Sequence, residues 1–331
     1  MIELKHNTLK FSFPDVHKKA RCEINFQRTL RIPDDNNSHS LPPGLGNFPL
    51  HHVDDYDSNL PATWKQHGGI FLPMYQAEAM WICFKGDYPC AIKIAAGKIN
   101  AVSGDMWTNE LDPNEQDYVV TPDQPWLDGF NVSEGHVRQF VAMPLGQSYT
   151  AEEQLTGAAE YGGLQIVVYP MKTAVYKKLF GSSWQQAGDF PTECSFSLCR
   201  EYVREEMGLA PGGLMKQEIY DDGYGIDAWD QEHGLRCFVH ITNSEAYEAI
   251  TGQQPPHECP SAEQYTSAGL PWFDYYSEKP PVKGAHTLAG LTSVAAKTIE
   301  VTGQPLCNNT LSGTPDVVKL HSGSVVRTGE F

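Results

Sequence analysis

The signatures of several common enzyme classes are missing from this sequence of 331 residues. It contains no GxGxxG, GxxxxGKS/T, GxSxG or HExxH string and no EF-hand loop. These strings carry phosphate-binding turns, nucleophiles and metal ligands in dinucleotide enzymes, P-loop NTPases, α/β-hydrolases and zinc hydrolases. Their absence makes each of these classes a poor expectation for this chain.

Positive charge is scarce. The 24 lysine and arginine residues are outnumbered by 41 aspartate and glutamate residues, which gives a formal net charge of -17. Phosphate backbones and anionic lipids repel such a chain, and no basic stripe offsets the repulsion. We therefore expect neither nucleic acid nor a membrane as a partner.

Long apolar runs are also absent. The longest candidates, residues 79–84 and 164–169, have the length of strands, far from the roughly 20 residues that span a bilayer. The first residues, Met1 to His6, lack the basic and apolar regions of a signal peptide. The sequence thus predicts a soluble, cytoplasmic protein.

The eight cysteines are dispersed through the chain and form no CxxC pair. Neither a dense disulfide scaffold nor a zinc site with tight ligand doublets is expected from such spacing. We interpret most of these cysteines as buried free thiols.

Alternation of apolar and polar residues is the clearest structural signal. Between Cys22 and Ile32 most even-numbered side chains are apolar and the others are polar, which is the period of a half-buried strand. Leu9, Phe11 and Phe13 alternate in the same way and are expected to pair nearby. With 40% hydrophobic residues, the chain can bury a core of such strands.

Strand patterns continue through residues 69–170, including a hairpin at Gly97 and one short helix capped by Thr150 and Glu153. Helical spacing with caps recurs later, over residues 192–208, 244–252 and 261–269. Because helices and strands do not alternate regularly, the sequence predicts an α+β, β-rich fold. Its core is an antiparallel sheet or sandwich, with short helices concentrated in the second half.

We divide the chain into a β-rich core (1–183), an α+β region (184–300) and an extended tail (301–331). The core contains a long loop over residues 33–69, and loops of that length usually serve function or an interface. Residues 183–191 are the best linker candidate. The α+β region either folds by itself or completes the sheet of the core.

The densest polar cluster lies in the long loop. His51, His52, Asp54 and Asp55 offer imidazole and carboxylate donors, which can hold a divalent metal that activates water. Their spacing matches no specific ligand rule, and adjacent residues of an extended backbone point in opposite directions. The alternative is a solvated turn in which the aspartates cap the backbone. No other cofactor is predicted.

A second acidic cluster surrounds Trp229 and consists of Asp221, Asp222, Asp227 and Asp230. Oxygen donors on a glycine-punctuated loop can bind calcium, and aromatic rings beside carboxylates can bind a sugar. The alternative is a connection between two strands whose aromatic residues pack on the core.

Two arginines are notable for their positions. Arg28 interrupts the apolar face of the strand that begins at Cys22, and an unpaired inward guanidinium is costly. It is expected to have a carboxylate partner, to lie at the rim of the sheet or to mark an anion site. Arg138, beside Gln139, is a similar case.

Five strings resemble a group of uncharacterised microbial proteins, over about residues 8 to 300. They are RTLRIPDD (28–35), QPWLDGF (124–130), RQFVAMPLG (138–146), MGLAPGG (207–213) and AGLPWFDYY (268–276). The resemblance implies no activity and no catalytic residue.

Three functional hypotheses follow. The first is a non-enzymatic, self-associating structural or scaffold protein, a homo-oligomer or filament subunit that uses the long loop, the tail and the aromatic segments 124–130 and 270–276 as contact surfaces. The second is a metal-assisted hydrolase that uses the loop with His51 and His52. The third is a module that binds calcium, a glycan or another small ligand near Trp229.

Overall fold

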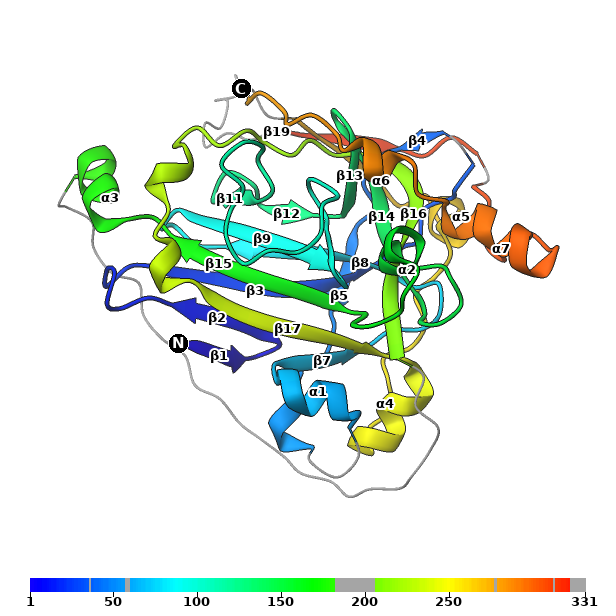
Figure 1. Cartoon of the computed structure of the whole chain (residues 1–331). Coiled ribbons are helices and arrows are strands. Elements are labelled where there is room, and N and C mark those ends of the chain that lie inside the picture. The colour runs from blue at the N-terminus through cyan, green and yellow to red at the C-terminus, as the bar shows by residue number, and fades with distance from the viewer. Residues whose placement is uncertain (36, 57–59, 182–205, 277–278, 312, 322–331) are drawn as a thin grey trace, which may run out of the picture.

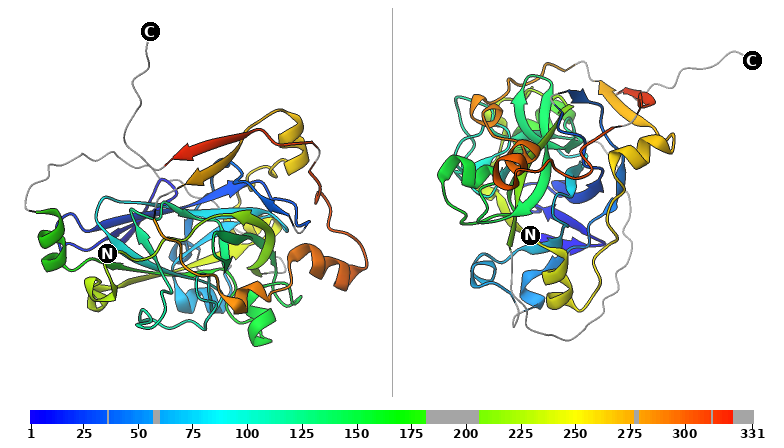
Figure 2. Two further views of the ribbon diagram at one scale, coloured as in Figure 1. Left: turned by 90° about the horizontal axis from the view of Figure 1, so that it is seen from above. Right: turned by 90° about the vertical axis from the view of Figure 1, so that its right-hand side faces the viewer.

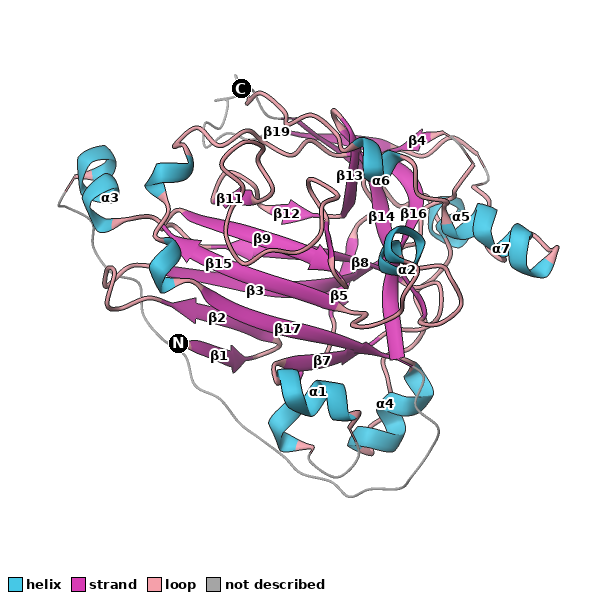
Figure 3. Cartoon of the chain, viewed as in Figure 1, coloured by secondary structure: helices cyan, strands magenta, loops and turns pink. Residues whose placement is uncertain are grey.

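The computed structural model describes residues 1–35, 37–56, 60–181, 206–276, 279–311 and 313–321 (Figure 1). In these residues strands form most of the regular structure, and the short helices lie around the sheet (Figure 3). The predicted β-rich α+β fold with an antiparallel sheet is confirmed, and most of the helices are in the second half of the chain, as expected.

One half of the main sheet is built on β3 (Arg21–Thr29), the strand that alternation predicted. On one side β3 pairs with β2 (Thr8–Ser12), and on the other with β8 (Ala79–Lys85). β1 (Ile2–Lys5) adds to the outer side of β2. All three pairings are antiparallel. Short connections join β1 to β2 and β2 to β3, whereas β8 follows β3 only after the long loop and several short elements.

The other half contains three long strands. β15 (Leu164–Pro170) lies between β9 (Cys90–Ala96) and β17 (Leu235–Thr242), antiparallel to both. β7 (Ile70–Pro73) extends this half as a strand parallel to β17. Every residue of β9 and β15 is buried, which explains why both strands are apolar apart from Lys93 and Gln165.

Two long strands join the halves. β14 (His136–Pro144) pairs with β8 and with β16 (Glu206–Lys216), and the first residues of β16 pair with the end of β17. The result is one hydrogen-bonded sheet, and its hydrophobic core contains side chains from both halves, including Ile24, Phe26 and Ile166. Strands from residues 206–242 therefore belong to the same sheet as strands from residues 1–183.

The remaining elements are short. The strands are β4 (Ser38–His39), β5 (Gly44–Asn47), β6 (His51–His52), β10 (Ile99–Asn100), β11 (Val119–Thr121), β12 (Trp126–Leu127), β13 (Gly129–Ser133) and a separate parallel pair, β18 (Trp272–Tyr276) with β19 (Val317–His321). The α-helices are α1 (Ala62–His67), α2 (Ala151–Thr156), α3 (Thr173–Phe180), α4 (Ser244–Thr251), α5 (Ala262–Ser267), α6 (His286–Ala289) and α7 (Val294–Thr302). The 3-10 helices are η1 (Val53–Asp55), η2 (Ile226–Ala228) and η3 (Gln231–His233).

Several local predictions are confirmed. The Thr150 and Glu153 side chains form the predicted capping box of α2, and β9 turns into β10 at Gly97, which has a positive φ of 57°. None of the helices in the described residues is long and apolar enough to cross a bilayer.

One helix prediction is wrong at its end. Most of the predicted helix over residues 192–208, and the linker 183–191, lie outside the described residues. Met207 and Gly208, which were expected to close that helix, belong to β16. Met207 is buried between Pro144 of β14 and Ile241 of β17, so pairing within the sheet determines its conformation.

Candidate functional site

The last part of the described chain forms an arm along the outside of the sheet. We define the C-terminal arm as residues 290–311 and 313–321, which include α7 and β19. Leu291, Val294 and Ala295 are buried, and α7 packs against β16. The rest of α7 lies at the edge of the molecule in Figure 1 and faces the viewer in the right-hand view of Figure 2.

Two side-chain amides tie the arm to the body. Gln154 of α2 donates to the carbonyl of Thr292 (2.9 Å) and accepts from its backbone N–H (2.7 Å). Asn309 of the arm accepts from the backbone N–H of Asp34 (2.9 Å) and donates to its carbonyl (3.2 Å). Each side-chain amide bonds both the N–H and the carbonyl of one residue, in the way that a paired β-strand would. These bonds fix the position of the arm on the body.

Arg31 adds a third tie. Its Nη2 donates to the carbonyl of Cys307 at 2.5 Å, and its Nη1 donates to the Oδ1 of Asn309 at 3.3 Å. Burial lowers the pKa of the Arg31 guanidinium, and the nearby Asp34 and Cys307 oppose that effect. The arm therefore crosses the body directly above the end of β3.

A cavity of about 200 Å³ lies beneath this crossing. It is bounded by the end of β3, the start of β8, the segment before α5 and the arm. The residues lining it are Thr29, Arg31, Tyr75, Gln76, Ala77, Glu78, Ala79, Glu258, Cys259, Pro260, Ser261, Leu306, Cys307 and Asn308.

An ion pair lies at the wall of this cavity. Arg28 donates from Nε (2.9 Å) and from Nη2 (2.7 Å) to Oε1 of Glu78, and both side chains are nearly buried, at 11% and 4% exposure. The other carboxylate oxygen of Glu78 accepts from the backbone N–H of Tyr75 (2.9 Å). Arg28 thus has the carboxylate partner that its place on an apolar face requires.

Cys259 also contacts this pair, because its Sγ donates to Oε1 of Glu78 at 3.4 Å. Burial raises the pKa of the Cys259 thiol to about 12, and the Glu78 charge adds to the effect. The thiol is therefore protonated at neutral pH and held in one position.

The outer side of the arm is apolar. Ile299 and Val301 of α7 are each 55% exposed, and Val318 and Leu320 of β19 are 40% and 41% exposed. Residues two apart on a helix point in nearly opposite directions, so Ile299 and Val301 are both exposed because the end of α7 leaves the body. Residues two apart on a strand share a face, so Val318 and Leu320 form a small apolar surface.

The predicted metal ligands do not converge. Both ring nitrogens of His51 are hydrogen-bonded, to the hydroxyls of Tyr247 (2.8 Å) and Tyr56 (3.0 Å). Burial lowers the pKa of His51 to about 4, so the ring is neutral. His52, Asp54 and Asp55 are exposed.

No group of three or more His, Cys, Asp or Glu side chains in the described residues could hold a metal ion. The sequence also contains a CxxH spacing, Cys237 and His240, which both lie on β17. Residues three apart on a strand point to opposite faces, so this pair does not form a ligand doublet.

The acidic cluster near Trp229 is spread over its loop. Asp222 accepts hydrogen bonds from the Tyr118 hydroxyl (2.7 Å), the Trp229 indole (2.8 Å) and the backbone N–H of Tyr224 (2.8 Å). Trp229 is buried, so its ring is part of the core. These contacts use the Asp222 carboxylate to hold the loop together.

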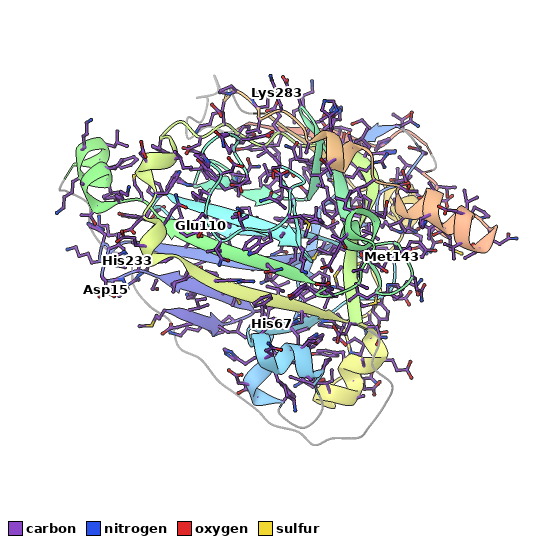
Figure 4. The ribbon with its side chains drawn as sticks, in the orientation of Figure 1. Asp15, His67, Glu110, Met143, His233 and Lys283 are labelled. Atoms are coloured by element: carbon purple, nitrogen blue, oxygen red, sulfur yellow. The ribbon has the colours of Figure 1, made fainter. Side chains whose placement is uncertain are left out.

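The other three aspartates of this cluster do not join Asp222. Asp230 caps η3 by accepting from the backbone N–H of His233, which lies on the side of the molecule opposite α7 (Figure 4). Asp221 and Asp227 are exposed.

Arg138 lies on β14, away from these groups. Its Nη1 bonds Asp34 Oδ1 (3.2 Å) and the carbonyl of Gly212 (3.0 Å). The backbone of Asp34 also bonds Asn309 of the arm. The ion pair with Arg138 therefore helps to hold Asp34 in position for that bond.

The aromatic segments pack inward. Trp272 is 1% exposed, and the ring of Trp126 meets that of Tyr275 edge-on with centroids 4.8 Å apart. These segments therefore contribute to the body more than to its outer surface.

No sequence pattern predicts the ties of the arm or the cavity below it. Glu78, Cys259, Cys307 and Asn309 belong to no recognisable motif and meet only in the folded chain. One available signal was charge: residues 290–321 contain two lysines and two acidic residues, so they carry no net charge in a chain of -17.

Comparisons with protein-family models, with curated proteins and with solved structures found no match for this chain.

Proposed function

We propose that this protein is a non-enzymatic, self-associating structural or scaffold protein of the cytoplasm, and that its C-terminal arm is the contact surface between copies. The observation that supports this proposal is the combination of exposed aliphatic side chains and zero net charge on the arm of a strongly acidic chain. Neither a metal nor another cofactor is needed for this role.

Burial of the exposed aliphatic side chains determines how strongly two copies are expected to associate. Each of the four exposed aliphatic side chains is about half exposed, so burying one contributes roughly 1 kcal/mol. Two arms in symmetric contact would contribute about 8 kcal/mol, of which the entropic cost of association removes at least about 4 kcal/mol. Association is therefore weak, with a dissociation constant near the millimolar range.

Charge decides where copies meet. Since the chain carries -17, two copies repel each other over most of their surface. The neutral arm is a place where they approach with less repulsion. Added salt screens the repulsion without weakening apolar contact, so association should strengthen as ionic strength rises.

Sedimentation velocity over a wide range of protein concentration tests the proposal. We expect the weight-average sedimentation coefficient of the wild-type protein to rise with concentration, and Ile299→Asp to abolish the rise. Leu179→Asp is the matched control, because Leu179 is 51% exposed and also lies near the end of a short helix, α3, outside the arm.

Two results would overturn the proposal. One is a strictly monomeric wild-type protein at every concentration and salt level. The other is an equal loss of association in Ile299→Asp and Leu179→Asp, which would mean that added charge anywhere on the surface suffices.

A further inference from the structure

Two segments from distant parts of the chain meet at the cavity beneath the arm, and each brings a cysteine to its lining, Cys259 and Cys307. Neighbouring positions at the end of β3 hold both segments. Arg28 donates to the carbonyl of His257 (2.5 Å), and Arg31 donates to the carbonyl of Cys307 (2.5 Å). The fold thus places the two thiols at one cavity.

The surroundings of the two thiols differ. Cys307 is exposed, and the Arg31 guanidinium holds its backbone carbonyl. A small disulfide reagent in solution can reach an exposed thiol directly. Cys259 is partly buried and donates its proton toward Glu78. Cys307 is therefore suited to attack first, and Cys259 to attack second.

We propose that Cys259 and Cys307 form a redox pair that a low-molecular-weight disulfide converts to an intramolecular disulfide, which fixes the C-terminal arm to the body. This inference concerns a single copy and does not depend on self-association.

The reaction has two exchange steps. The Cys307 thiolate attacks one sulfur of the reagent RSSR, which breaks the reagent's S–S bond, forms Cys307–S–S–R and releases RS⁻. Cys259 then attacks the Cys307 sulfur, the bond between that sulfur and SR breaks, and the proton of Cys259 leaves with the departing group as RSH. The RS⁻ released in the first step takes up the proton that Cys307 lost, so two cysteine thiols and RSSR become one protein disulfide and two RSH.

Bond formation requires a change of shape. A disulfide brings the two Cβ atoms to about 4 Å, whereas in this structure both cysteines are free thiols in the lining of one cavity. Formation of the bond therefore draws Cys259 and Cys307 together across the cavity. Arg31 and Asn309 hold the segment around Cys307 beside the cavity before the bond forms.

The test uses the reduced, full-length protein under native conditions with excess oxidised glutathione. After alkylation of free thiols and digestion without reduction, we expect mass spectrometry to detect a Cys259–Cys307 cross-linked peptide and the loss of alkylation at both cysteines. Cys259→Ser and Cys307→Ser should each abolish that peptide. Cys83→Ser, a partly exposed cysteine on β8, should leave it unchanged.

Hydrogen exchange provides a second measurement. Backbone amides of residues 306–309 should exchange several-fold more slowly after oxidation, because the segment is then held on both sides of the cavity.

Three results would overturn the proposal. In the first, Cys307 retains bound glutathione while Cys259 is still fully alkylated. In the second, Cys307 pairs with another cysteine of the same chain. In the third, the cross-link joins two copies, as a doubled mass on a non-reducing gel would reveal.

Discussion

Removing Glu78 tests the ion pair on which the end of β3 depends. In Glu78→Ala the guanidinium of Arg28 remains at 11% exposure without its carboxylate, and the backbone N–H of Tyr75 loses its acceptor. Breaking a buried ion pair on one side typically costs about 3–5 kcal/mol, because the remaining charge stays desolvated. At about 2 °C per kcal/mol for a chain of this size, the melting temperature should fall by roughly 6–10 °C.

Urea unfolding followed by tryptophan fluorescence measures this change directly. The matched control is Glu23→Ala, because Glu23 forms an ion pair of similar length with Lys10 (2.9 Å) but both side chains are more than one third exposed. Such a surface pair contributes at most about 1 kcal/mol. If Glu78→Ala lost no more stability than Glu23→Ala, the reasoning from burial would be refuted.

Two further predictions concern the core. Burial raises the pKa of Asp128 from its ordinary value of 3.8 to about 7. Between these values the folded state binds a proton that the unfolded state has released, so wild-type stability falls as pH rises, by roughly 1.4 kcal/mol per pH unit. Asp128→Asn should therefore gain stability relative to the wild type from about pH 4 to pH 7 and level off above, and equal pH profiles in chemical denaturation would contradict this. A Cβ at Gly129 would lie 1.9 Å from the Arg138 carbonyl oxygen, so Gly129→Ala should cost at least about 2 kcal/mol. Gly223→Ala, with nothing within 4 Å and no positive φ, should change stability by less than about 0.5 kcal/mol in the same assay, and equal losses would show that the clash is relieved without cost.

The strands with strict alternation could be predicted because one face of each is buried. β3 begins at Arg21, one residue before the predicted start, and pairs with the predicted neighbour that contains Leu9 and Phe11. Short helices with capping boxes were equally predictable, since the Thr150 and Glu153 side chains determine where α2 begins without help from the rest of the chain.

Long-range pairing could not be predicted in the same way. Met207 continued a helical spacing in sequence, yet β14 and β17 on either side of it place it in a strand. Nothing local in residues 206–216 reveals these neighbours. The same limit applies to β18 and β19, which pair in parallel across a sequence separation of more than 40 residues.

Partners that are distant in sequence also could not be predicted at the candidate site. The position of Arg28 on an apolar face indicated a carboxylate partner as one possibility, but no sequence pattern identified Glu78 as that partner. His51 shows the same limit, because a loop rich in His and Asp suggests metal ligands, whereas both His51 nitrogens are hydrogen-bonded to tyrosine hydroxyls in the fold. In both cases a partner far apart in sequence, Glu78 for Arg28 and Tyr247 for His51, helps to determine the environment of the side chain.

Hydrogen exchange of the wild-type protein at low and at high concentration is the most direct test of where copies meet. Slower exchange at high concentration, confined to residues 294–302 and 313–321, is the result that the neutral apolar arm predicts. Exchange that is independent of concentration in these residues, or protection that falls elsewhere on the chain, would contradict it.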